Sequence, residues 1–336
     1  MEATHRFEGS KTGARDGRRV GLRLYDRCEV VLTGPDAFVD AAIRYLWPQA
    51  RPVPGRDGLP QVRLVLGRIA PGLVADASRR RVMLYSSPDG HVPDFNEGVE
   101  YIGVPGVDRL VLNPHTGSHF LMAGHRVCVV NPEFEAGKRD ALRVVKQLVT
   151  TAFEAVGVVT VHASAFALGD EAVAVAGPAG AGKTSTVLAA VVAGARMVAN
   201  DKLYACTDTD GTHVRGWTDP IRVIDAPGHP KRSATLAAYF AGDADRVVTD
   251  PLPLKTVVLA RVGTSSVPVR CEELNRTAGL LLLRREVLPP RVRWLGTEPS
   301  PASDPAPPTA DRFLCLTYGY RDAARAMDLL MRRLAA

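Results

Sequence analysis

Residues 177–184 of this chain, GPAGAGKT, fit the phosphate-loop pattern G-x-x-x-x-G-K-[ST] at every fixed position. Small residues allow such a loop to curl, so that successive N–H groups point at a phosphate beside the positive end of a helix. In this pattern Lys183 reaches the β- and γ-phosphates and the hydroxyl of Thr184 binds Mg²⁺. The sequence therefore predicts that a nucleoside triphosphate is bound by Gly177, Pro178, Ala179, Gly180, Ala181, Gly182, Lys183, Thr184 and Ser185.

The flanking segments have the order that a phosphate loop requires. Residues 171–176 (EAVAVA) are typical of a short buried strand, and residues 185–193 (STVLAAVVA) of a helix that ends at the C-cap residue Gly194. The alternative is an Ala/Gly-rich turn that binds nothing.

Two further side chains could act on a bound triphosphate. Asp201 follows a predicted strand at 196–200, and a right-handed strand–helix–strand crossover would place that strand parallel to and near the first, with Asp201 facing the phosphates. A carboxylate there can hold Mg²⁺ or accept a proton from an attacking hydroxyl, whereas the alternative is a surface Asp that caps a loop. His162 ends a predicted strand at 158–162 and is either catalytic or an ordinary core or loop histidine.

These residues resemble a known family. The segments VHAS (161–164), AVAVAGPAGAGKTS (172–185) and GARMVANDKL (194–203) are similar to the catalytic domain of HPr kinase/phosphorylase and its related proteins. That family keeps a His before the loop's strand and a short strand ending in two acids after the loop's helix, and the spacings from His162 to Lys183 and from Lys183 to Asp201 match it. The C-terminal residues 315–334 also look like the end of such proteins, so the resemblance covers about residues 138–336, with a weaker middle part.

The resemblance implies an α/β nucleotide domain of the type shared by HPr kinase and phosphoenolpyruvate carboxykinase. It also implies a kinase that uses ATP and Mg²⁺, with Asp201, His162 and Lys183 as catalytic residues and Thr184 and Asp201 on the metal. The acceptor would be a Ser- or Thr-type hydroxyl on a peptide, such as a biosynthetic precursor peptide, on a protein, or on a small metabolite.

Two departures from the family limit what carries over. Asn200 stands where the family has its first acid, so only Asp201 of that pair can take a proton. Residues 224–228 (IDAPG) lack the arginine of the family's downstream signature, which disfavours phosphorylase activity. Arg222 or Arg232 could supply that charge, or both could be ordinary surface arginines.

Three other functions stay open. One is the bifunctional HPr kinase/phosphorylase itself, and another is a regulator that binds ATP without transferring phosphate. The phosphoenolpyruvate carboxykinase reaction would need further metal-binding His and Lys residues upstream, for which the sequence offers no candidates.

At 336 residues and 46% hydrophobic content, the chain is long enough for two domains. Residues 1–135 are expected to form a smaller, mixed, mostly antiparallel β-rich domain, a candidate for substrate recognition, and residues 136–336 the catalytic domain. Helices are predicted at 38–46, 138–156 and 321–334. Strands are predicted at 20–25, 29–32, 62–66, 81–85, 109–112, 119–123, 126–130, 255–262 and 315–318.

Two other segments have a composition unlike that of regular elements. Residues 298–310 contain five prolines and are expected to form an extended linker or lid. Residues 226–250 are rich in Gly, Pro, Ala and Asp and are a second segment that could close over a substrate.

Charge and cysteine content exclude several classes of function. The net charge of +6 is spread among 36 acids and aromatic residues make up only 6%, which disfavours nucleic acid as a partner. The five cysteines lie far apart, so neither a zinc site nor a disulfide framework is expected. Cysteines spaced in this way fit a reducing, cytoplasmic location. The N-terminus is polar and no apolar run approaches about 20 residues, so we expect no secretory signal, no membrane segment and a soluble protein. Whether the chain forms a homo-oligomer stays open.

Overall fold

The computed structural model describes residues 17–25, 27–84, 97–178, 180–217, 219–223, 232–263, 267–288 and 306–336. Its contacts divide the described residues into two compact units, each with its own sheet. The first unit runs to Ile43 and from Ala50 to Ala152, and the second holds Arg44–Gln49 and the residues from Phe153 onward. The expected boundary at 135/136 lies in the first turn of the helix α4 (Phe134–Glu154), whereas the contacts divide the chain near the end of that helix.

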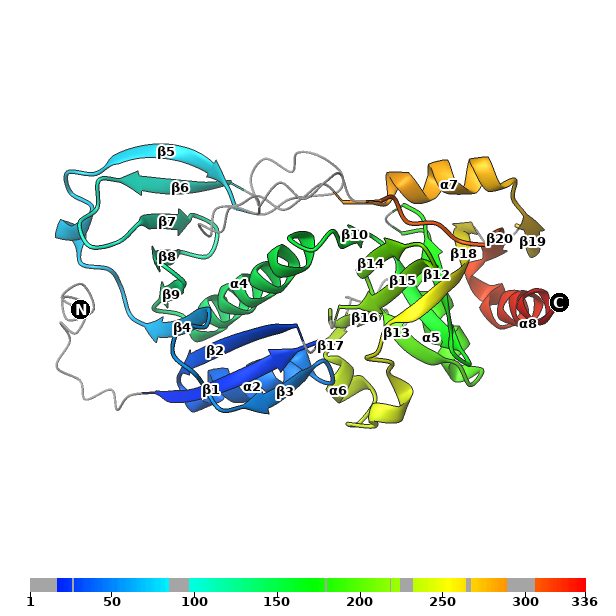
Figure 1. The fold of residues 1–336 in the computed structure, drawn as a ribbon, viewed down its shortest axis with the longest axis horizontal. Helices are drawn as coiled ribbons and strands as arrows, with labels where there is room; N and C mark the ends of the chain where they lie inside the picture. Colours follow the sequence, from blue (N-terminus) through cyan, green and yellow to red (C-terminus); the bar gives the residue numbers. More distant parts are fainter. Residues whose placement is uncertain are drawn as a thin grey trace. The chain divides into compact units, whose positions relative to one another are not determined.

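The first unit is built on a nine-stranded sheet (Figure 1). Its neighbours pair antiparallel except β2 with β4 and β4 with β9, which are parallel. The expected antiparallel character therefore holds for most of the sheet, and β3 and β6 are strands that the sequence reading missed. In sheet order the strands are β3 (Ala50–Val53), β1 (Arg18–Leu24), β2 (Cys28–Gly34), β4 (Gln61–Leu66), β9 (Arg126–Asn131), β8 (Ser118–Ala123), β7 (Arg109–Asn113), β6 (Glu97–Ile102) and β5 (Ser78–Met83).

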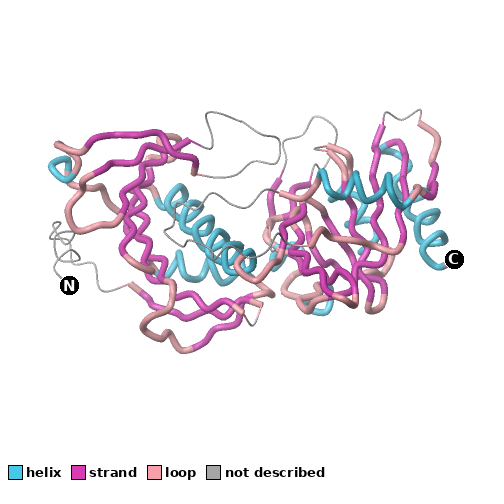
Figure 2. Tube along the Cα trace, turned by 45° about the horizontal axis from the view of Figure 1, so that its top comes forward, coloured by secondary structure: helices cyan, strands magenta, loops and turns pink. Residues whose placement is uncertain are grey.

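The helices α2 (Asp36–Leu46) and α4 belong largely to this unit (Figure 2). A Cβ atom at Gly137 would lie 2.8 Å from Cδ1 of Leu64, so the glycine permits close approach of α4 to β4. The helix begins at Phe134, four residues before the predicted start at Lys138. The prediction missed this first turn because the turn lacks the apolar spacing on which the prediction rested. A separate apolar cluster joins Tyr101 and Leu110 to residues around the 3₁₀ turn η1 (Pro71–Leu73).

The second unit is built on another sheet, also of nine strands, whose central strand is β18 (Leu252–Gly263). The strand that feeds the phosphate loop, β12, pairs parallel with β18, and so does β20. In order the strands are β10 (Val159–Val161), β14 (Leu203–Asp208), β15 (Gly211–Gly216), β18, β12 (Glu171–Ala176), β11 (Ser164–Leu168) and β13 (Arg196–Ala199), with β20 (Arg312–Gly319) beside β18 and β19 (Arg270–Glu273) beside β20.

One strand separates the strand before Asp201 from the strand that feeds the loop. β11 lies between β12 and β13 and is antiparallel to both, so β13 is parallel to β12 but not its neighbour. The cause is a tight hairpin from β11 to β12, which turns at Gly169 with φ of +58°. The predicted direction of the second strand is therefore confirmed, and one strand, β11, separates it from β12.

Helices pack on this sheet in two separate apolar clusters. α5 (Lys183–Val192) and α8 (Ala323–Ala335) share one cluster, whereas α7 (Arg276–Arg285), which the sequence reading missed, contributes Leu283 to the other. α5 begins at Lys183, two residues before the prediction, and Gly194 follows its end at φ +102°, as a C-cap glycine should. The smaller elements are β16 (Ile221–Val223), β17 (Arg232–Ala234), α6 (Leu236–Tyr239), η2 (Ala244–Arg246) and η3 (Tyr320–Asp322).

Several sequence predictions fall outside the described residues. They are Ala179 of the loop, residues 224–228 of the missing signature, and parts of the two segments expected to act as lids. Among the helices of the described ranges, none combines the length and the hydrophobicity needed to span a membrane.

Candidate active site

The phosphate loop connects the end of β12 to the start of α5. Gly177, Gly180 and Gly182 have φ angles of +138°, +82° and +86°, and residues other than glycine rarely adopt positive φ angles of this kind. A Cβ atom at Gly182 would also lie 2.2 Å from Cγ2 of Val262, and one at Gly177 would lie 3.0 Å from the carbonyl oxygen of Ala260. The glycines of the pattern are thus required both by the curl of the loop and by the neighbouring strand β18.

Lys183 is the first residue of α5, and its side chain turns back over the loop. The residue is only 8% exposed, and Nζ donates hydrogen bonds to the carbonyl oxygens of Gly177 at 2.7 Å and Pro178 at 3.2 Å. Thr184 is half-buried and Ser185 is exposed. Next in the helix, the hydroxyl of Thr186 lies 2.9 Å from that of Tyr318 on β20, which anchors the first turn of α5 to the sheet.

His162 and Asp201, which are far apart in sequence, lie side by side. His162 directly follows β10 and Asp201 lies just after β13, and His162 Nε2 is 3.5 Å from Oδ1 of Asp201. On the other side of the ring, Nδ1 is 3.3 Å from a carboxylate oxygen of Glu286. The imidazole therefore lies between two carboxylates.

These neighbours favour the charged form of the imidazole. Hydrogen bonds to Asp201 and, next in weight, to Glu286 raise the pKa of His162 to about 9, against the opposing effects of burial and of the positive charge of Lys183. At neutral pH His162 is an imidazolium ion. Because the charge of Lys183 acts on the imidazole of His162, the lysine of the loop lies near His162 and Asp201.

The second oxygen of Asp201 faces another cation. Its Oδ2 lies 2.9 Å from Nζ of Lys202, which is also 3.8 Å from Oδ2 of Asp219. The side chain of Asp201 is 40% exposed, whereas those of Lys202 and Asp219 are 20% and 17% exposed. Asp201 is thus held from two sides and still open to solvent.

Asn200, which replaces the family's first acid, is part of the protein interior. It is 5% exposed, and its side-chain amide donates to the carbonyl oxygen of Pro220 at 2.8 Å. Ser164 donates a hydrogen bond to its main-chain oxygen. The side-chain oxygen of Asn200 is buried with no hydrogen-bond partner among the described residues.

The residues present fit a magnesium ion shared with phosphates. Mg²⁺ in nucleotide sites is held by one or two protein oxygens in addition to phosphate oxygens and water. The hydroxyl of Thr184 and the partly exposed carboxylate of Asp201 are oxygen ligands of that kind. No group of three or more His, Cys, Asp or Glu side chains placed to hold a metal without phosphates occurs in the described ranges.

The sequence analysis did not single out four residues of the site, three of them near His162 or Asp201 and one beside the first turn of α5. Glu286 comes from the end of the unpredicted helix α7, and Lys202 directly follows Asp201. Asp219 and Tyr318 carry no local pattern that marks them. Of the two arginines considered for the missing signature, Arg232 is exposed at the start of β17, and the described main chain places Arg222 on β16.

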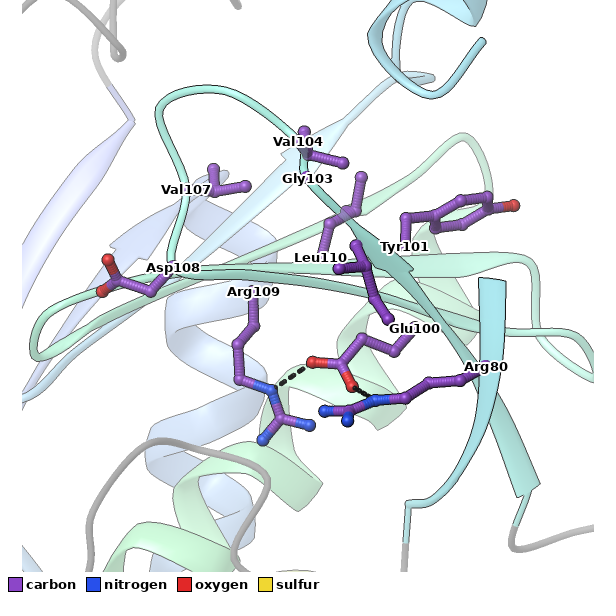
Figure 3. Close-up of a pocket in the computed structure, with 10 residues that line it drawn as sticks. Arg80, Glu100, Tyr101, Gly103, Val104, Val107, Asp108, Arg109 and Leu110 are labelled. Carbon is purple, nitrogen blue, oxygen red and sulfur yellow. Dashed lines mark hydrogen bonds and ion pairs between the residues drawn. The ribbon is translucent and has the colours of Figure 1, made fainter. Parts of the chain in front are cut away.

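The first unit has a pocket of about 590 Å³ that none of the predicted site residues lines (Figure 3). On one side of it, Glu100 accepts hydrogen bonds from Nε of Arg80 and Nε of Arg109, both at 2.6 Å. The carboxylate side chain is only 5% exposed. Its charge is therefore already paired within the protein.

Comparisons with known proteins identify no family for this chain. No protein-family model matches this chain, and no curated protein is similar to it. A solved structure of the Hpr(Ser) kinase/phosphatase from Coxiella burnetii is similar with a TM-score of 0.32 and 12% identity, over 52% of this chain and 95% of that one. A similarity of this size transfers no activity, so the function has to be argued from the site itself.

Proposed function

We propose that this chain is an ATP- and Mg²⁺-dependent kinase that transfers the γ-phosphoryl group to a Ser- or Thr-type hydroxyl. The observation that carries the proposal is the meeting of His162 and Asp201, 3.5 Å apart, near the lysine of a phosphate loop with the required glycine geometry. A phosphate loop alone is shared by motors, switches and kinases. A partly exposed carboxylate beside a cationic imidazole adds what a transferase needs, because it can orient an acceptor.

The loop and Lys183 bind the triphosphate. The main-chain N–H groups at the start of α5 and the ammonium group of Lys183 neutralise the β- and γ-phosphates. Thr184 and Asp201 would hold Mg²⁺, which supplies further positive charge to the phosphate oxygens when it is bound.

Asp201 orients the acceptor hydroxyl and takes its proton as the oxygen–phosphorus bond forms. The bond from the γ-phosphorus to its bridging oxygen breaks, and ADP leaves with those electrons. His162, as an imidazolium ion, adds a cation beside Lys183 where negative charge is spread over the transferred group. Because such transition states are loose, most of the catalysis comes from positioning and charge neutralisation.

The acceptor is proposed at the level of its chemistry. A Ser- or Thr-type hydroxyl follows from the resemblance to HPr kinase, and peptides, HPr itself and free serine are the candidates that it suggests. Asn200 cannot accept a proton, which favours the forward kinase reaction over phosphorylase action.

The direct test is incubation with γ-labelled ATP and Mg²⁺ together with serine-containing peptides, HPr or free serine, with ATP binding measured in parallel. Label on an acceptor supports the kinase. Tight ATP binding without transfer to any acceptor would contradict it and favour a nucleotide-binding regulator. Absence of ATP binding would contradict both functions.

A further inference from the structure

The chain segment after α7 forms a short pairing with β10, the strand that directly precedes His162. The main-chain N–H of His162 donates to the carbonyl oxygen of Glu286 at 2.7 Å, and the N–H of Leu288 donates to that of Thr160 at 2.8 Å. Between them, Val161 and Val287 form an antiparallel bridge. The end of α7 therefore holds the main chain at His162 by hydrogen bonds that do not involve the side chain of Glu286.

The carboxylate of Glu286 makes a separate contact with the imidazole ring. It lies 3.3 Å from Nδ1 of His162, and both side chains are only 16% exposed. Because Nδ1 faces Glu286, the opposite nitrogen of the ring, Nε2, faces Asp201. A carboxylate on one ring nitrogen fixes the rotation of a histidine and determines what the other nitrogen can contact.

The position of Glu286 in its helix argues against a purely stabilising role for the carboxylate. Glu286 is the C-cap of α7, where the negative end of the helix dipole disfavours an acidic side chain. α7 is attached to the unit by other groups, since Leu283 is 1% exposed in the apolar cluster and Asn275 caps the other end of the helix.

We propose that Glu286 is a positioning residue for His162, acting through the imidazole on phosphoryl transfer. The proposal rests on the kinase function above, because it assigns Glu286 a part in that same reaction. Glu286 aims Nε2 of His162 at Asp201 and at the group being transferred, and it does not itself contact ATP or the acceptor.

The test is a double-mutant cycle of Glu286→Gln and His162→Ala in the labelled-ATP assay. In the otherwise wild-type chain, Glu286→Gln lowers kcat by about tenfold, the size of a lost charge-assisted hydrogen bond, and leaves the KM for ATP within about twofold. In the His162→Ala background the same substitution has no further effect, because Glu286 acts only through the ring. The matched control is Glu272→Gln on β19, where the carboxylate is 66% exposed and 3.9 Å from Arg270, and it leaves kcat unchanged.

Two results would overturn the proposal. One is an unchanged kcat in Glu286→Gln, and the other is an equal loss of kcat with and without His162. Denaturant unfolding of each variant accompanies the assay, and the main-chain bond from His162 to residue 286 does not depend on the substituted side chain.

If the wild type transfers no phosphate, the kinase function fails, but the positioning contact is still tested. ¹⁵N NMR of the ring nitrogens, with His162 assigned through His162→Ala, should show a change at Nδ1 in Glu286→Gln and none in Glu272→Gln. An unchanged His162 spectrum in Glu286→Gln would reject the contact itself.

Discussion

Each unit of the molecule holds a carboxylate between two basic side chains, and the two arrangements differ. Glu100 of the first unit has both arginines at 2.6 Å and a side chain 5% exposed. Asp201 of the second unit has Lys202 at 2.9 Å and His162 at 3.5 Å, with 40% of its side chain exposed. The first carboxylate is enclosed and its charge is fully paired, whereas the second is held loosely and remains open.

The difference separates a structural ion pair from a candidate reactive one. Removing one partner from a buried, closely bonded pair leaves a desolvated charge behind and costs stability. A partly exposed carboxylate contributes little to stability but can accept a ligand or a proton. Substitutions at Glu100 should therefore change folding, and substitutions around Asp201 should change chemistry.

The largest effect is expected from removing the ammonium group of Lys183 in the phosphate loop. Lys183→Ala should lower turnover by at least about a hundredfold, because the β- and γ-phosphates lose their ammonium partner. Turnover and ATP affinity of the purified variant measure this loss. The control is Lys255→Ala, whose ammonium group pairs at 2.9 Å with Asp311 and should leave both quantities unchanged, and equal losses in the two variants would contradict the assignment.

The enclosed carboxylate should show the opposite result. Glu100→Gln should lower the free energy of unfolding by about 2 kcal/mol, because Arg109 keeps its charge and loses its anion. Chemical denaturation measures this, with Glu97→Gln as the control. Glu97 lies on the same strand, 3.6 Å from an arginine that is 86% exposed, so its loss should cost less than about 0.5 kcal/mol.

The comparison of Glu100 with Asp201 would break if Glu100→Gln left stability unchanged and abolished activity. That result would move the reactive site to the first unit, beside its pocket.

The smallest effect is expected in the pH dependence. His162 has a pKa raised to about 9 in the folded chain, mainly by Asp201, so its stabilising contribution is complete below pH 6.5 and is lost as pH rises through 9. In metal-free protein, NMR titration should place its pKa near 9, and Asp201→Asn should move it back toward the ordinary value of 6.5. An ordinary pKa in the wild type would show that the two carboxylates do not hold the ring.

The Glu100 carboxyl should depend on pH in the opposite sense. Burial raises its pKa, but hydrogen bonds from Arg109 and Arg80 outweigh this and leave the pKa below its usual value. Its contribution to stability is therefore present above the pKa of the unfolded chain and is lost toward acid.

Local spacing was enough to predict the parts of the site that are contiguous in sequence. The glycines of the loop, the strand β12 before it and the C-cap Gly194 follow from backbone requirements that a few neighbouring residues satisfy. The expectation that Asp201 follows a strand parallel to β12 relied on the usual crossover rule, and it held even though β11 lies between the two strands.

The remaining contacts of the site depend on long-range order that no local pattern encodes. Glu286 reaches His162 only because the end of α7 pairs with β10, and the sequence analysis did not predict the helix α7. Asn275, whose side chain caps Thr277 ahead of four leucines, was the signal that could have found this helix.

The most direct test of the kinase assignment is the turnover of Asp201→Asn with γ-labelled ATP, Mg²⁺ and an accepted substrate, beside its ATP affinity measured without Mg²⁺. The amide keeps the size of the side chain and removes its ability to take a proton. We expect turnover to fall by at least about a hundredfold while the metal-free ATP affinity and the unfolding curve stay close to wild type. Full activity in Asp201→Asn would contradict the assignment of the open carboxylate as the reactive group.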